Sequence, residues 1–233
     1  MKLIFIHGSG GYEGIWRYQI AHFLDSEAIT LPGHPQGQPC RSVEEYRDWL
    51  RKYIKERNYE DVVLAGHSLG GAIAMAYALE YPQDLRGLIL IGTGARLKVH
   101  PMYIKQLEKA MEGNLEDWYE WMEGTHPLVE QGFKRELIER HKFIGPAVQL
   151  NDLLCCHDFD VMDRVQEIKL PALIICGDSD MMTPVKYASY LGNKIQGSKV
   201  AIIPGTTHLT FVEKPDEVNK AIEEFLRRRI MLC

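Results

Sequence analysis

A serine between two glycines carries the clearest chemical signal in this sequence. Residues 66–70 match the pattern G-x-S-x-G, with Ser68 at the centre. The short apolar run at 62–65 is typical of a buried strand, and the alanine-rich stretch from Ala72 onward predicts a helix. A serine on such a tight strand-to-helix turn has a strained backbone and an exposed hydroxyl, and the flanking glycines avoid collisions. The pattern therefore predicts that Ser68 is a nucleophile.

A serine hydroxyl attacks a carbonyl only when a base removes its proton and a third group orients that base. His208 is our candidate base, because it lies in a loop directly after the last predicted strand. Asp180 is our candidate for the orienting carboxylate. Asp178 is the alternative, although an aspartate directly after Gly177 can instead stabilise the turn. We favour Asp180 over Asp178.

The oxyanion that forms during such an attack needs two backbone N–H donors. Leu69, at the start of the predicted helix, is one candidate. Ser9 is the other, with Gly10 as its alternative, because both lie in a glycine-rich loop after the first apolar run. We interpret His7 as an anchor for this loop and His67 as a turn residue, both structural.

Strands and helices alternate along most of the chain, which predicts a parallel sheet with helices on both faces. The glycine loop, Ser68, Asp180 and His208 each follow an apolar strand directly, so all four are expected at the carboxyl end of the sheet. The predicted strands are residues 3–6, 28–31, 62–65, 87–92, 172–176 and 199–203.

The alternation stops between residues 95 and 168. Charged helical segments, broken by glycine and proline, replace it. We predict a helical cap inserted into one core domain that comprises residues 1–94 and 169–233. Aromatic and methionine side chains at helical spacing are most often ordinary core, and some are expected to line a substrate pocket: Met102, Met111, Trp118, Trp121 and Met122.

Composition and charge exclude several classes of function. The 233 residues are 45% hydrophobic and 25% charged, which is typical of one globular core. A net charge of −5 and the lack of a long basic stretch argue against a nucleic-acid partner. No apolar run is expected to span a membrane. Five cysteines without a C-x-x-C pair argue against a disulfide framework or a metal site, and we expect a cytoplasmic protein.

The chain resembles the α/β-hydrolase fold family. The similarity spans nearly the whole sequence, in the order nucleophile, acid, histidine, at residues 5–10, 31–34, 66–71, 177–180 with Pro184, and 205–208 with 213–215. It implies Asp180 as the acid, Ser9 as an oxyanion donor, and a helical cap at 95–168. It also implies an α/β fold with about six strands, mostly parallel, because the family's first two edge strands have no counterpart. The loop at 30–35 departs from the family's usual D-L-P-G-H-G.

The resemblance implies a serine carboxylesterase that cleaves small-to-medium apolar esters through an acyl-enzyme on Ser68, without cofactor or metal. A serine at this position argues against the dehalogenase and epoxide hydrolase branches, which carry aspartate. A carbon–carbon bond hydrolase, a lactonase or a thioesterase uses the same groups, and so does an aminopeptidase. A non-catalytic ligand-binding receptor on this fold is an alternative of another class. We expect a small-molecule ester substrate and a monomer or homodimer.

Overall fold

A six-stranded parallel sheet forms the centre of the protein. The structure is a computed structural model that describes residues 1–34 and 36–230. The strand order is β2-β1-β3-β4-β5-β6, and each neighbouring pair is parallel. The strands are β1 (Lys2–Ile6), β2 (Ser26–Ile29), β3 (Val62–His67), β4 (Leu85–Ile91), β5 (Ala172–Gly177) and β6 (Lys199–Ile203). The predicted class, an α/β fold with about six strands, is confirmed.

Alternate side chains of the four central strands, β1, β3, β4 and β5, enter two different cores. Leu3 and Phe5 of β1 pack on one face with Trp16, whereas Ile4 and Ile6 pack on the other. This period of two is a property of extended backbone, and burial on both faces explains why these four strands are rich in apolar residues. The sheet is therefore a rigid support for whatever its strand ends carry.

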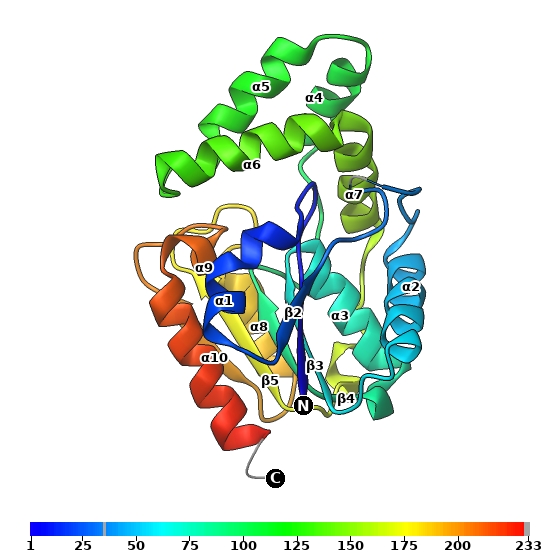
Figure 1. Ribbon diagram of the computed structural model, residues 1–233, viewed down its shortest axis with the longest axis vertical. Coiled ribbons are helices and arrows are strands. Elements are labelled where there is room, and N and C mark those ends of the chain that lie inside the picture. The colour runs from blue at the N-terminus through cyan, green and yellow to red at the C-terminus, as the bar shows by residue number, and fades with distance from the viewer. Residues whose placement is uncertain (35, 231–233) are drawn as a thin grey trace.

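Helices cover both faces of this sheet. Figure 1 shows α2 and α3 on one side and α1, α9 and α10 on the other. Their bounds are α1 (Arg17–His22), α2 (Val43–Glu56), α3 (Leu69–Glu80), α8 (Val185–Lys194), α9 (Thr210–Glu213) and α10 (Pro215–Arg229), with short 3-10 turns η1 (Glu13–Trp16), η2 (Pro82–Asp84) and η3 (Val165–Glu167).

Four further helices lie beyond the carboxyl ends of the strands, at the top of Figure 1. They connect β4 to β5 and share a small apolar core around Leu107, Trp118 and Ile138. Cys155 and Cys156 of the last helix also enter the main core, so this helix ties the group to the sheet. The helices are α4 (Pro101–Met111), α5 (Leu115–Gly124), α6 (Gln131–Ile144) and α7 (Pro146–Asp158).

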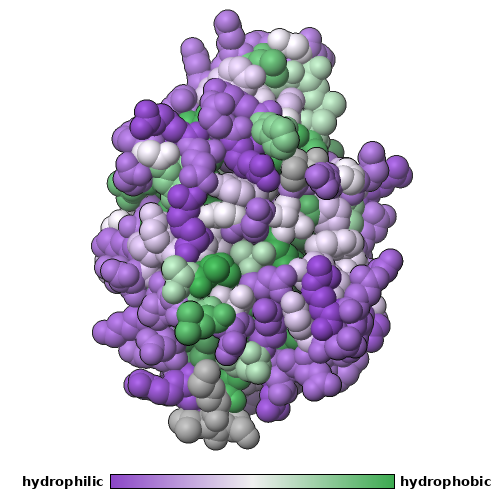
Figure 2. All heavy atoms as spheres, viewed as in Figure 1, coloured by the Kyte–Doolittle hydropathy of each residue, from purple (hydrophilic) through white to green (hydrophobic). Residues whose placement is uncertain are grey.

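The surface is mostly hydrophilic on the face seen in Figure 2, where apolar side chains gather only in small groups. Among the described residues, no helix combines the length and the apolar character that crossing a membrane requires.

Candidate active site

Ser68 occupies a strained turn between β3 and α3. Its φ of 52° and ψ of −114° are unusual for a residue with a side chain. Four hydrogen bonds impose this conformation. The Ser68 N–H donates to Ile91 O at 3.0 Å, while Ser68 O accepts from Gly71 N, Ala72 N and Thr93 Oγ1 at 3.0, 3.1 and 2.9 Å. The strand ladder and the helix start thus hold the serine side chain at the end of the sheet.

The two flanking glycines are required by close packing. A Cβ on Gly66 would collide with the backbone of Gly70, and a Cβ on Gly70 would collide with the carbonyl of Ile6. Helix α3 therefore starts against the ends of β1 and β3 at a distance that only glycine allows.

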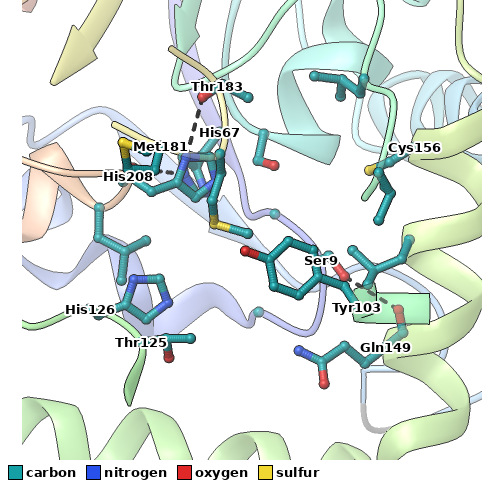
Figure 3. A pocket seen from close by; sticks show the side chains of 18 of the residues that line it. Ser9, His67, Tyr103, Thr125, His126, Gln149, Cys156, Met181, Thr183 and His208 are labelled. Carbon is teal, nitrogen blue, oxygen red and sulfur yellow. Dashed lines mark hydrogen bonds between the residues drawn. The ribbon is translucent and has the colours of Figure 1, made fainter. Parts of the chain in front are cut away.

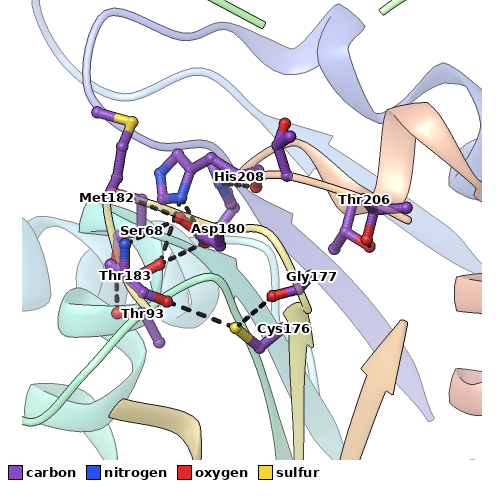
Figure 4. A network of polar contacts seen from close by, with 12 residues as sticks. Ser68, Thr93, Cys176, Gly177, Asp180, Met182, Thr183, Thr206 and His208 are labelled. Carbon is purple, nitrogen blue, oxygen red and sulfur yellow. Dashed lines mark hydrogen bonds and ion pairs between the residues drawn. The ribbon is translucent and has the colours of Figure 1, made fainter. Parts of the chain in front are cut away.

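The imidazole of His208 is held by Asp180. His208 Nδ1 lies 2.9 Å from Asp180 Oδ2, and Asp180 is only 3% exposed (Figure 4). A carboxylate only accepts hydrogen bonds, so Nδ1 carries a proton, and no residue that the structure describes bonds to Nε2. The arrangement provides a base whose tautomer and orientation are set before any substrate arrives.

The other contacts of Asp180 keep it ionised. Thr183 Oγ1 donates to Oδ2 at 2.7 Å, and the N–H groups of Met182 and Thr183 donate to Oδ1 at 2.8 and 2.9 Å. Burial by itself would raise the pKa of Asp180, but the hydrogen bond and charge of His208, together with the Thr183 contacts, lower that pKa to about 2.

Asp178 has a different set of partners. Its Oδ1 accepts from Gly205 N at 2.9 Å, from Ser179 Oγ at 3.0 Å and from Thr206 N at 3.4 Å. These contacts, led by the Gly205 hydrogen bond, lower the pKa of its exposed carboxyl. Asp178 connects the loops after β5 and β6 and does not contact His208, so of the two aspartates only Asp180 can orient that imidazole.

Ser68 and His208 line the same cavity, of about 480 Å³. A Cβ on Gly92 would lie 3.3 Å from His208 Nδ1, and Ser68 N–H bonds to the adjacent Ile91, so both groups adjoin the end of β4. Within residues 1–34 and 36–230, no hydrogen bond joins Ser68 Oγ to His208. Catalytic contacts of this type often close only when substrate binds.

Two N–H groups of the loop after β1, those of Ser9 and Gly10, are candidate oxyanion donors, and their contacts differ. Gly10 N–H donates to Asp152 Oδ2 at 2.9 Å and is therefore occupied. In the part of the chain that the structure describes, the N–H groups of Ser9 and Leu69 have no protein acceptor. Ser9 is thus better suited than Gly10 to receive a developing negative charge.

Asp152 is a site residue that the sequence did not indicate. It lies on α7, is fully buried, and accepts hydrogen bonds from Gly10 N, from His34 Nε2 at 2.7 Å and from Tyr46 OH at 3.0 Å. Burial by itself would lower the pKa of His34, but the hydrogen bond and charge of Asp152 raise it above the usual value. This ion pair joins three distant segments behind the loop that carries Ser9.

His7 and His67 form buried structural hydrogen bonds. His7 Nε2 accepts from Leu31 N at 3.0 Å, so its Nδ1–H donates to Gly8 O at 2.8 Å. His67 Nε2–H donates to His208 O at 3.1 Å. Burial is the main reason that the pKa of each imidazole lies well below its usual value, so both are neutral near pH 7.

Because the pKa values of these two histidines are lowered by folding, we expect the protein to lose stability in mild acid. In the unfolded chain both titrate near pH 6.5. Below that pH the unfolded state takes up protons that the folded state does not, so the free energy of unfolding falls by up to about 1.4 kcal/mol per pH unit for each histidine. Urea denaturation at pH 7.5, 6 and 5 measures the slope. Replacing the half-exposed His22 with glutamine should not change it, and a constant free energy of unfolding over this range would contradict the prediction.

The aromatic and methionine side chains that the sequence indicated in residues 95–168 have different surroundings. Met102 and Trp121 line the cavity, Trp118 is buried in the apolar core of the four helices, Met122 belongs to that core and also lines the cavity, and Met111 is exposed. The cavity wall is mostly apolar on this side. Figure 3 shows Tyr103 and Gln149 reaching into the same space as Ser9 and His208.

Comparison with known proteins finds one family across nearly the whole chain. Residues 3–221 match the model described as the Alpha/beta hydrolase family. A solved structure of a thermophilic esterase is 30% identical, with a TM-score of 0.85 over 97% of this chain and 89% of the other.

Two curated relatives have different activities in their names. The chain is 27% identical over 198 residues to a proline iminopeptidase of Saccharolobus solfataricus, covering 72% of this chain but only 62% of that relative's length. It is 23% identical to a pimeloyl-[acyl-carrier protein] methyl ester esterase of Yersinia enterocolitica, covering 97% of this chain and 93% of the relative.

Proposed function

Because the chain belongs to the alpha/beta hydrolase family, we propose that it is a serine carboxylesterase that cleaves small-to-medium apolar esters through an acyl-enzyme on Ser68. One observation carries the proposal: the imidazole of His208 is hydrogen-bonded through Nδ1 to the buried Asp180, its Nε2 bonds to none of the described residues, and it lines the same cavity as Ser68. This is the relation that general-base activation of a serine requires.

In the proposed mechanism, Ser68 Oγ attacks the ester carbonyl carbon while His208 Nε2 accepts the hydroxyl proton. Asp180 holds the resulting imidazolium, and the N–H groups of Ser9 and Leu69 donate to the oxyanion. Collapse of the tetrahedral intermediate breaks the ester C–O bond, and the imidazolium gives its proton to the departing alcohol. A water, deprotonated by His208, then attacks the acyl carbonyl and releases the carboxylic acid and the free serine.

The cavity supports the choice of substrate class. Its wall on the side of residues 95–168 is mostly apolar, which favours uncharged acyl or alcohol groups of moderate size. We include in the proposal that residues 95–168 act as a cap over the site and that residues 1–94 and 169–233 form the core. The proposal also includes a cytoplasmic location and a monomeric or homodimeric state. The four cysteines among the described residues are free thiols, which is consistent with a reducing compartment.

A substrate panel with a covalent probe tests this function. We expect turnover of p-nitrophenyl acetate and butyrate, and a fluorophosphonate adduct on the peptide that contains Ser68. The panel includes a lactone, a thioester, a vinylogous diketone and a prolyl amide, so that preference for one of these would reassign the substrate class. Absence of turnover together with absence of the adduct would overturn the proposal and favour a ligand-binding protein.

A further inference from the structure

The side-chain amide of Gln149 has a defined orientation. Gln149 lies on α7, is 6% exposed and lines the cavity. Trp118 Nε1 donates to Gln149 Oε1 at 3.0 Å. An indole N–H is a donor only, so the amide oxygen must face Trp118 and the NH2 group must face the other way. Because Trp118 is itself buried among α4–α7, this orientation is fixed by packing.

The NH2 group lies next to the loop that carries the proposed oxyanion donor. The position of a Cβ on Gly10 would be 3.3 Å from Gln149 Nε2, and Ser9 Oγ donates to the backbone carbonyl of Gln149 at 3.5 Å. Among the described residues, Gln149 Nε2 has no acceptor. Figure 3 shows the Gln149 side chain directed into the cavity near Ser9 and Tyr103. A donor is thus available close to the place where an ester carbonyl would bind.

A second neutral polar group accompanies this amide. His141 Nε2, on α6, would lie 3.2 Å from the same Cβ on Gly10, and His141 also lines the cavity. Burial, with a smaller contribution from the charge interaction with His34, lowers the pKa of His141 to about 4, so its ring is neutral near pH 7. Both groups are neutral, and a neutral donor can satisfy a neutral oxygen acceptor, whereas a buried carboxylate needs a paired charge at the point where it binds.

We propose that Gln149 Nε2, flanked by His141, is a specificity subsite that binds a second, neutral oxygen of the substrate near the scissile carbonyl. The ligand is a keto, ether or hydroxyl oxygen, so the preferred substrates are oxygenated esters and not purely alkyl ones. The proposal rests on the esterase function proposed above. An unsatisfied amide donor in an apolar wall discriminates because an alkyl chain leaves it without a partner.

Three p-nitrophenyl esters of similar length test the subsite: pentanoate, 4-oxopentanoate and 3-methoxypropanoate. For the wild-type protein, we compare two ratios of each oxygenated ester to pentanoate: the ratio of kcat/KM values and the ratio of alkaline hydrolysis rates. We expect the first ratio to be about five times the second for at least one oxygenated ester, which is the effect of one neutral hydrogen bond. This measurement needs no variant, so it does not depend on a substituted protein folding.

Gln149→Met removes the donor and keeps the side-chain length. We expect it to lower kcat/KM for the oxygenated ester about 3- to 10-fold more than for pentanoate, mainly through KM. Gln131→Met, at the exposed start of α6, is the matched control and should change neither.

Three outcomes would overturn the proposal. A wild-type preference equal to the chemical ratio would overturn the subsite alone, because pentanoate turnover still supports the esterase. An equal loss on all three esters in Gln149→Met would assign the residue a structural role. Absence of turnover of every ester would overturn the esterase function and the subsite with it.

Discussion

Replacing Ser68 with alanine is expected to lower kcat for p-nitrophenyl butyrate by about 10⁴-fold or more. In the proposed mechanism the hydroxyl oxygen is the atom that forms the acyl bond, and alanine has no atom that can replace it. Any remaining rate would come from the oxyanion donors and the cavity, which act on water directly. Steady-state kinetics with the purified variant measure the loss.

Ser189→Ala provides the matched control for this loss. Ser189 is exposed on α8, away from the cavity, and its replacement should leave kcat within about twofold, as expected of a surface substitution. Circular dichroism and a thermal melt establish that Ser68→Ala is folded. If folded Ser68→Ala retained a tenth of the wild-type rate, the acyl-enzyme mechanism would be wrong.

Asp180→Asn is expected to lower kcat by about 10⁴-fold, with a small change in KM. The asparagine amide either presents its NH2 to His208 Nδ1 or leaves the backbone N–H groups of Met182 and Thr183 opposite a donor. In the first case the imidazole takes the tautomer with hydrogen on Nε2 and no longer accepts the Ser68 proton. The charge that would stabilise the imidazolium is lost in both cases.

Asp178→Asn is the sharpest comparison, because the same substitution two residues earlier removes a carboxylate that contacts only loop groups. We expect its kcat to stay within about threefold of wild type, while its thermal stability falls slightly with the weakened contacts to Gly205 and Thr206. Equal losses of kcat in the two variants would mean that catalysis depends on the negative charge in this loop and not on the hydrogen bond between Asp180 and His208. A larger loss in Asp178→Asn would reverse the assignment of the acid.

Local features made the turn at Ser68 predictable from the sequence. The two glycines are needed because the helix start meets the strand ends at backbone contact, and their spacing around the serine is visible in five consecutive residues. The buried strands were predictable for a similar reason, since a strand covered on both faces must be apolar throughout. The edge strand was less clear: the apolar pattern predicted residues 28–31, whereas its ladder with β1 places β2 at Ser26–Ile29.

Contacts between distant segments were not predictable in this way. Asp152 lies 142 residues from Gly10 and 118 from His34, and no local pattern distinguishes it from other acidic residues on a helix. The order of the helices also decided that Trp118 is buried and orients the Gln149 amide, whereas Trp121 faces the cavity. The two tryptophans are only three residues apart on α5, and the packing of α5 against its neighbours decides which of them is buried and which lines the cavity.

The sequence by itself determined the kind of chemistry this protein can host, because a serine between glycines, a histidine after the last strand and two nearby aspartates already restrict it. Only the tertiary structure decided which aspartate contacts the histidine, which N–H groups are free and where an amide donor faces the cavity. The physical reason is that turn residues and apolar strands leave a pattern in the local sequence, whereas hydrogen-bond partners and cavity walls depend on segments that folding brings together, from 28 residues apart for Asp180 and His208 to 142 for Gly10 and Asp152.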